Sequence, residues 1–158
     1  MHLSFWVILK GQTKLALLVC LFFVVQSSQA LMTETQELKF GKYAIAGNVR
    51  GSVLIVPYTG AAPWATNKIY ILLAGQAGHY QLSGFPANTP LNITIPDFFL
   101  TLPESESFKV GQFTHVNLIT DSSGNAFLKL GATLYTSGNG NPYVYGSYFG
   151  NMDITIHF

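Results

Sequence analysis

The residues Tyr148-Phe149-Gly150-Asn151-Met152-Asp153-Ile154-Thr155-Ile156-His157-Phe158 end the chain and alternate in character. Apolar residues occupy the even-numbered positions, and mostly polar residues stand between them. An alternation of period two is typical of a strand that turns one face toward a core. We expect this segment to be such a strand and an essential part of the sheet to which it belongs.

The rest of the chain after residue 30 also favours strands over helices. Short runs of β-branched and aromatic residues are separated by Gly, Pro, Asn and Ser, with no sustained helical periodicity. This pattern predicts an all-β sandwich or barrel. The expected strands are residues 38–46, 51–56, 68–73, 79–83, 91–95, 107–118, 126–135 and 143–158.

The breaks between these runs have turn chemistry. Residues 121–125 and 137–142 are rich in Gly, Asn and Ser, and Gly124 can supply the positive φ that a tight turn needs. Pro57 and Pro96 each close a strand, because proline offers no N–H to a neighbouring strand. No linker or internal repeat divides residues 31–158, which predicts a single domain.

The first thirty residues have the features of a signal peptide. Lys10 and Lys14 precede the apolar run 15–25, and Ser28-Gln29-Ala30 places small residues where a signal peptidase reads them. We expect residues 1–30 to be removed by cleavage after Ala30. The protein is then exported to the periplasm, the cell surface or the extracellular medium.

Two other interpretations of this segment are open. A retained membrane anchor would need about 20 apolar residues, more than the run 15–25 provides. A lipid anchor on Cys20 would need a small residue before it, where Val19 stands. We expect no transmembrane segment in the mature protein.

The composition of residues 31–158 limits the kinds of molecule that the protein could bind. These residues contain no cysteine, so packing without disulfides must stabilise the domain. They carry six Lys and Arg against seven Asp and Glu, a net charge of −1, while the whole chain has a net charge of +1. With few charges and no basic cluster, nucleic acid and anionic membrane surfaces are poor candidate partners.

Several segments, in this order, resemble an uncharacterised family of exported bacterial all-β domains, which is similar to pilin-like and spore coat U type domains. The segments are 38–41 (LKFG), 51–57 (GSVLIVP), 77–86 (AGHYQLSGFP), 91–96 (LNITIP), 130–134 (LGATL) and 145–150 (YGSYFG). The resemblance implies an immunoglobulin-like, antiparallel β-sandwich in the envelope or on the surface, sometimes assembled with neighbours. It implies no catalytic residues.

One feature departs from pilins that polymerise by strand exchange. Such subunits donate an N-terminal extension with alternating apolar residues to a neighbour's sheet. Here only residues 31–37 precede the first expected strand, and Met32, Glu34 and Gln36 occupy their even positions. This segment is a poor donor, so a self-contained domain is at least as well supported as a polymerising subunit.

The titratable residues form no motif for catalysis or metal binding. His79, His115 and His157 all fall in expected strands, and their spacing gives no HxH or HxxxH pair. Glu104 and Glu106 fit a solvated loop better than an acid and base pair. The loop 121–125 lacks the later acidic ligands of a calcium loop. We expect no enzyme activity, no metal and no cofactor.

Aromatic residues are the remaining candidates for binding. Tyr143 and Tyr145 flank the Gly/Asn-rich turn 137–142 and share a strand face if the pleat is regular, and Trp64 lies in the loop 57–67. Exposed aromatic rings can stack on sugars or anchor a protein partner. We expect a non-enzymatic structural or interaction protein, fimbrial or coat-like, whose partners are like subunits or an envelope or host-surface molecule. The alternative is a monomeric binding module for a glycan or partner protein.

Overall fold

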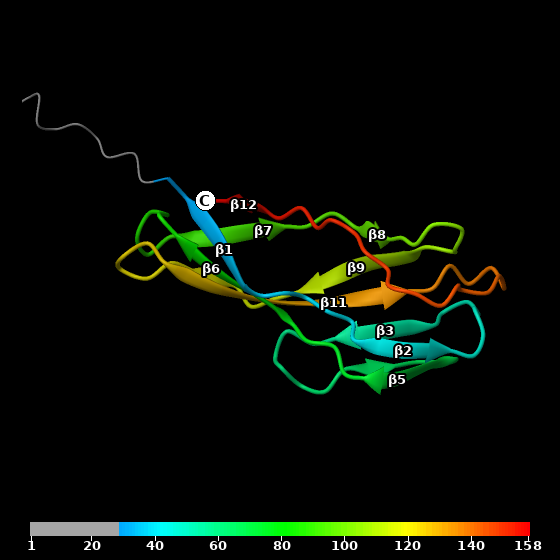
Figure 1. Cartoon of the computed structure of the whole chain (residues 1–158). Coiled ribbons are helices and arrows are strands. Elements are labelled where there is room, and N and C mark those ends of the chain that lie inside the picture. The colour runs from blue at the N-terminus through cyan, green and yellow to red at the C-terminus, as the bar shows by residue number, and fades with distance from the viewer. Residues whose placement is uncertain (1–28) are drawn as a thin grey trace, which may run out of the picture.

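The computed structural model describes residues 29–158, so the predicted signal peptide lies outside the described residues except for Gln29 and Ala30. Residues 29–158 contain strands and no helix, hence no helix that could cross a membrane. The prediction of an all-β fold is confirmed. The strands form antiparallel sheets, one large and two small (Figure 1).

The large sheet has seven strands. Its main path runs in the order β1, β6, β11, β3 and β4, while β9 pairs with β11 and β8 pairs with β9. The bounds are β1 Leu31–Gln36, β3 Val53–Val56, β4 Trp64–Ala65, β6 Gly78–Ser83, β8 Phe98–Leu100, β9 Phe108–Thr114 and β11 Ala126–Tyr135.

The two small sheets pack on the same face of the large one. One consists of β10 (Leu118–Ile119), β7 (Pro90–Thr94) and β12 (Thr155–His157), and the other of β2 (Lys42–Ile45) and β5 (Ile69–Leu73). Side chains from β7, β10 and β12 share a core cluster with β6 and β11. Side chains from β2 and β5 share a second cluster with β3, β9 and β11.

Strand β11 connects the two clusters. Leu128 and Leu130 belong to the cluster under β7, while Ala132 and Leu134 belong to the cluster under β2 and β5. Strand β6 pairs with the first half of β11 and β3 with the second half, so Gly131 lies between the two paired segments. A side chain at Gly131 would overlap the backbone of Val56 and the residues after it, so the strand must carry glycine there.

The C-terminal alternation is confirmed, but the strand is shorter than predicted. Met152, Ile154 and Ile156 pack against the cluster under β7, and the residues between them are exposed. Only Thr155–His157 pairs with β7, so the expected strand 143–158 is wrong before residue 155. The last position also differs, because Phe158 is 66% exposed and its ring meets that of Phe85 edge-on.

The expected start of the first strand at residue 38 is wrong. Strand β1 begins at Leu31 and pairs with β6, with a bulge between Glu34 and Gln36. Its side chains are exposed, except for a half-buried Gln36, so the strand is held by backbone pairing rather than by an apolar face. Hydrophobic alternation cannot detect a strand of this kind. The expected strand 38–46 shortens to β2.

Other differences arise where the chain changes sheet. The expected strand 107–118 is divided, because β9 ends at Thr114 and β10 begins at Leu118, where the chain pairs with β7 instead of the large sheet. Gln112, with a φ of 48°, lies inside β9 where its register with β11 shifts. The short strands β4 and β8 were expected to be loop. The turn at 121–125 is confirmed: Asp121 Oδ1 accepts hydrogen bonds from the amides of Ser123 and Asn125, and Gly124 has a φ of 77°.

The terminal segment gives a direct test of the buried face. Replacing Ile154 or Ile156 by Asp should place an unpaired charge against the core and cost about 3 kcal/mol or more, enough to prevent folding of a marginal domain. Thr155→Asp on the exposed face should change the free energy of unfolding by less than about 0.5 kcal/mol. Denaturant titration measures the free energy of unfolding of each variant, and the soluble yield reports whether it folds. Similar losses of stability in all three variants would contradict the assigned buried and exposed faces.

A second prediction concerns two buried hydroxyl groups. Ser52 is 1% exposed and its Oγ has no hydrogen-bond partner among residues 29–158, so Ser52→Ala should raise the free energy of unfolding by about 1 kcal/mol. Thr120 is equally buried, but its Oγ1 donates to Pro86 O and accepts from the amide of Thr89. Thr120→Val should therefore be destabilising by about 1–3 kcal/mol. Thermal denaturation measures the change in stability of each variant. A loss of stability in Ser52→Ala would refute the prediction.

Candidate functional site

Trp64 is exposed on a sheet edge, as a binding residue would have to be. It lies in β4 and pairs with Ile55 of β3, while its neighbour Ala65 faces the core. The side chain is 50% exposed and makes no ring contact within residues 29–158. The indole ring is therefore open to a ligand, whereas the backbone that holds it belongs to the large sheet.

Tyr143 is occupied by the core. Its ring stacks on Phe108 with centroids 4.0 Å apart, and its hydroxyl accepts a hydrogen bond from the Ser137 amide and donates to Ser107 O. Burial of Phe108 and these bonds make Tyr143 a structural residue. The expectation that Tyr143 and Tyr145 share one strand face is wrong, because residues 143–148 form no strand.

Tyr145 points fully into solvent from a segment that is firmly held. Ser105 Oγ accepts a hydrogen bond from the amide of Val144, and the Tyr148 hydroxyl donates to Val144 O. The tyrosine side chain itself has no partner in the described part of the chain. It is an available contact residue, but the structure does not bring it together with Trp64 and Tyr143 into one site.

Asn48 organises the Gly/Asn-rich turn before these tyrosines. Its buried amide group donates to Ser137 Oγ, Asn139 Oδ1 and Asn141 O at 2.7–2.9 Å, and its Oδ1 accepts from the Gly138 amide at 2.7 Å. One buried side chain thus satisfies groups along the whole turn. The sequence pattern predicted the turn but not this anchor, which lies about ninety residues away along the chain.

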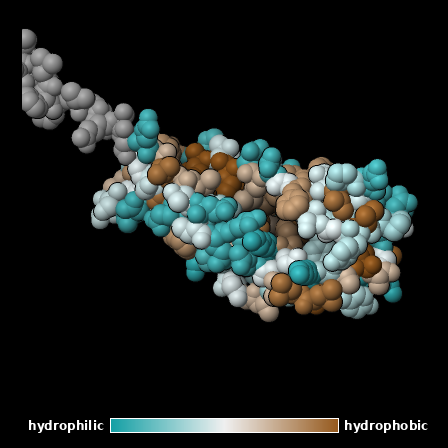
Figure 2. Space-filling model, viewed as in Figure 1, coloured by the Kyte–Doolittle hydropathy of each residue, from teal (hydrophilic) through white to brown (hydrophobic). Residues whose placement is uncertain are grey.

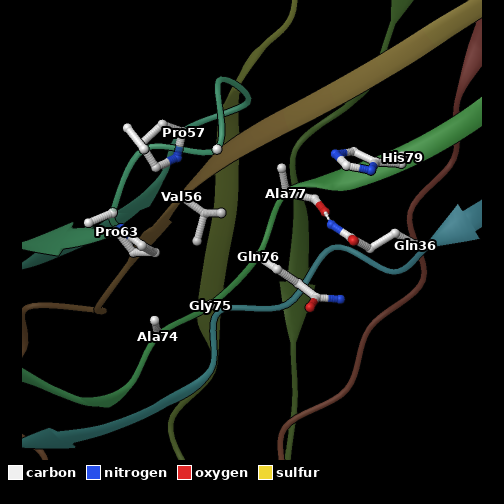
Figure 3. Close-up of a pocket in the computed structure, with 12 residues that line it drawn as sticks. Gln36, Val56, Pro57, Pro63, Ala74, Gly75, Gln76, Ala77 and His79 are labelled. Carbon is white, nitrogen blue, oxygen red and sulfur yellow. Dashed lines mark hydrogen bonds between the residues drawn. The ribbon is translucent and has the colours of Figure 1, made fainter.

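A pocket of about 410 Å³ opens between the loop after β3 and the segment before β6 (Figure 3). Its walls are mainly small residues of 60–63 and 74–77. Gln36 Nε2 donates to Ala77 O at 2.7 Å across one side of the pocket. Within the described residues, His79 is the one titratable side chain that lines it. The pocket therefore offers shape and a few hydrogen bonds rather than a pair of acid and base groups.

The histidines and carboxylates are dispersed. His79 lies in β6 and His157 in β12, but His115 lies between β9 and β10, outside the strand in which it was expected. Residues 29–158 contain no group of three or more His, Cys, Asp or Glu side chains that could hold a metal ion. Glu106 lies in a loop, as expected, where the side-chain amide of Asn141 donates to it and lowers its pKa.

A larger surface is the outer face of the large sheet, opposite the core. Core side chains alternate with outward ones along each strand, and cross-strand pairing places the outward ones in rows. The outer face, as we define it, consists of Trp64 (β4), Val53 and Ile55 (β3), Thr133 and Tyr135 (β11), Lys109 (β9) and Phe99 (β8). Phe99, Lys109 and Tyr135 were not candidates in the sequence analysis.

An ion pair lies within the outer face. Asp97 Oδ2 is 2.7 Å from Lys109 Nζ, and this hydrogen bond and the charge of Asp97 raise the pKa of Lys109. Gly111, the next outward position on β9, leaves space for the Asp97 carboxylate, because a side chain there would overlap it. The absence of a side chain at Gly111 thus allows an acidic group to lie over the sheet.

A separate hydrophobic patch covers β5. Figure 2 shows hydrophobic side chains along the lower margin of the molecule, where Figure 1 places this strand. Tyr70, Leu72 and Leu73 are all more than half exposed. Strand β5 pairs only with β2, so this patch lies on a two-stranded ribbon and not on the large sheet.

The anchoring role of Asn48 can be tested by changing one atom. Asn48→Asp replaces the donating amide nitrogen by an oxygen that faces three acceptors, and should be destabilising by about 2–3 kcal/mol. Asn67→Asp is the matched control, because the Asn67 amide is exposed and donates to Gly51 O alone. The control should lose less than about 1 kcal/mol. Denaturant titration distinguishes the two, and equal losses would contradict the role of Asn48.

The comparisons with known proteins give a family without a function. A family model described as a domain of unknown function, DUF4402, matches residues 31–158, which is nearly all of the described part. No curated protein and no solved structure matches the chain. The match begins at the first residue of β1 and ends with the last residue of the chain. The chain belongs to the DUF4402 family of domains of unknown function.

Proposed function

We propose that this chain is a non-enzymatic structural or interaction protein of the bacterial envelope or surface, of fimbrial or coat-like type. In this proposal residues 1–30 are a cleaved signal peptide, and residues 31–158 form an immunoglobulin-like, pilin-like β-sandwich. Two small sheets on one face of a large sheet, with a core in between, support the sandwich. The apolar run 15–25 and the small residues before Leu31 support export.

Strand β1 is the observation that carries this proposal. It begins at Leu31, immediately after the predicted cleavage site, and occupies an edge of the large sheet. Backbone pairing to β6 holds it, together with side-chain bonds such as Thr35 Oγ1 to His79 O at 3.1 Å. Its exposed side chains contribute little to the core. Residues 31–36 lack the alternating apolar side chains of a pilin donor, but a strand held mainly by its backbone can leave β6 without opening the core, and an equivalent strand of a second copy can replace it.

Strand exchange predicts oligomers that resist detergent at room temperature and dissociate on boiling. Native protein, heated briefly below its melting temperature and cooled at high concentration, should give a ladder on a detergent gel. A disulfide between Thr33→Cys and Gln81→Cys, which are opposed in the β1–β6 register, should prevent the ladder when formed in the monomer first. Reduction of this bond should restore it.

A strictly monomeric protein after the same treatment would contradict the assembling function. It would favour the second candidate, a monomeric module that binds a glycan or a partner protein. The exposed side chains of Trp64 and Tyr145 support this second function, since both rings project from well-held backbone. Light scattering of the untreated protein gives its molar mass in solution, against which the heated sample is compared in testing the two candidate functions.

A further inference from the structure

The outer face of the large sheet has an aromatic ring at each side. Trp64 lies on β4 and Phe99 on β8, the two outermost strands of this region, and they are 50% and 58% exposed. Four strand spacings of about 4.8 Å and one step along a strand separate them by about 20 Å. Ile55 and Tyr135 lie between, half-buried on the same face. The surface is long, broad and built on paired backbone.

The part of the outer face beside Phe99 is polar and has no net charge. Asp97 and Lys109 form an ion pair and supply acceptors and donors that are about half exposed. The Tyr135 hydroxyl, which lies near Lys109, has no hydrogen-bond partner within residues 29–158. Hydrogen bonds that involve a charged partner are stronger than neutral ones. A ligand with many hydroxyl groups can use the acceptors and the donors at once.

From these features we propose that the outer face binds a neutral oligosaccharide that stacks on Trp64 and Phe99 and donates and accepts hydrogen bonds at Asp97, Lys109 and Tyr135. A sugar ring has apolar C–H faces that pack on aromatic rings and a rim of hydroxyl groups. The length of the surface fits a chain of several sugars rather than one. This inference rests on the second proposed function, the binding module, and names its ligand class and site.

The charge of the surface decides against other occupants. A nucleic acid or acidic polysaccharide would need several free cations, but the face carries one lysine, which Asp97 already neutralises. A second copy of the chain that covered the surface from Trp64 to Phe99 would also bury this ion pair, and charged residues are depleted in interface cores because their desolvation is costly. A neutral chain of sugars needs no free cation, and its hydroxyl groups can hydrogen-bond to the ion pair while water still reaches the charged groups.

The test uses full-length chain with Trp6→Phe, so that Trp64 is the only tryptophan. The probes are cellohexaose, xylohexaose, maltohexaose and chitohexaose, measured by calorimetry and by the fluorescence of Trp64. At least one of these hexasaccharides should bind and shift the fluorescence emission of Trp64. Its affinity should not change when the salt concentration is raised, because the ligand is neutral. In calorimetry, Trp64→Ala and Phe99→Ala should each weaken binding about tenfold or more.

Tyr70→Ala is the matched control, since Tyr70 is 55% exposed but lies on the two-stranded sheet. It should bind as the parent does, and all variants should keep the parent melting temperature. The inference is overturned if no hexasaccharide binds, if Tyr70→Ala weakens binding as much as Trp64→Ala, or if the protein is a dimer that Trp64→Ala dissociates. A monomer that binds no hexasaccharide overturns this inference but leaves the binding-module function intact.

Discussion

The structure depends on the continuous burial of one face of β11. Leu128, Leu130 and Leu134 are fully buried, and Ala132 between them is nearly so. Because these four residues recur at every second position of one strand, both core clusters lie on the same face of β11, and the two small sheets cover that face. Strands β3, β6 and β9 pair with β11 directly, and the two small sheets pack over it. The opposite face is left without a second sheet of described residues.

The edges of β11 impose a further constraint. Its second half pairs with β3 on one edge and β9 on the other, while its first half pairs with β6. The transition falls at Gly131, where the backbone of the β3 end approaches too closely for any side chain. Beyond this close approach the chain makes an excursion from β11 between Val56 and Gly78, in which β4 pairs with the far edge of β3 and β5 pairs with β2. The pocket and the position of Trp64 both follow from that excursion.

Much of the fold was predictable because hydrophobic alternation reports which side chains are buried. The runs that became β3, β5, β7 and β11 were placed within a few residues, and the inward positions of Ile154 and Ile156 were right. Alternation carries no information on backbone pairing, which explains why β1 was missed and the C-terminal strand was drawn too long. Two-residue strands such as β4 leave no periodic signal at all.

The candidate site shows the same limit. Trp64 was recognised as a loop aromatic, and its exposure is confirmed, whereas Tyr143 proved to be a core residue stacked on Phe108. Phe99 and Asp97 were not recognised, because the outer face joins strands far apart in sequence through their register. A usable signal was present in Lys109 and Gly111, which occupy the outward positions between buried residues of an apolar strand.

Amide hydrogen exchange of the folded protein, followed by NMR, tests the central position of β11 most directly. The hydrogen-bonded amides of residues 128–134 should exchange slowest, and only through global unfolding, since both small sheets pack over them. The amides of β1 should exchange much faster, through an opening that leaves β11 protected. Exchange of the β11 amides at the rate of β1, or a lower opening free energy for β11 than for β12, would contradict this account.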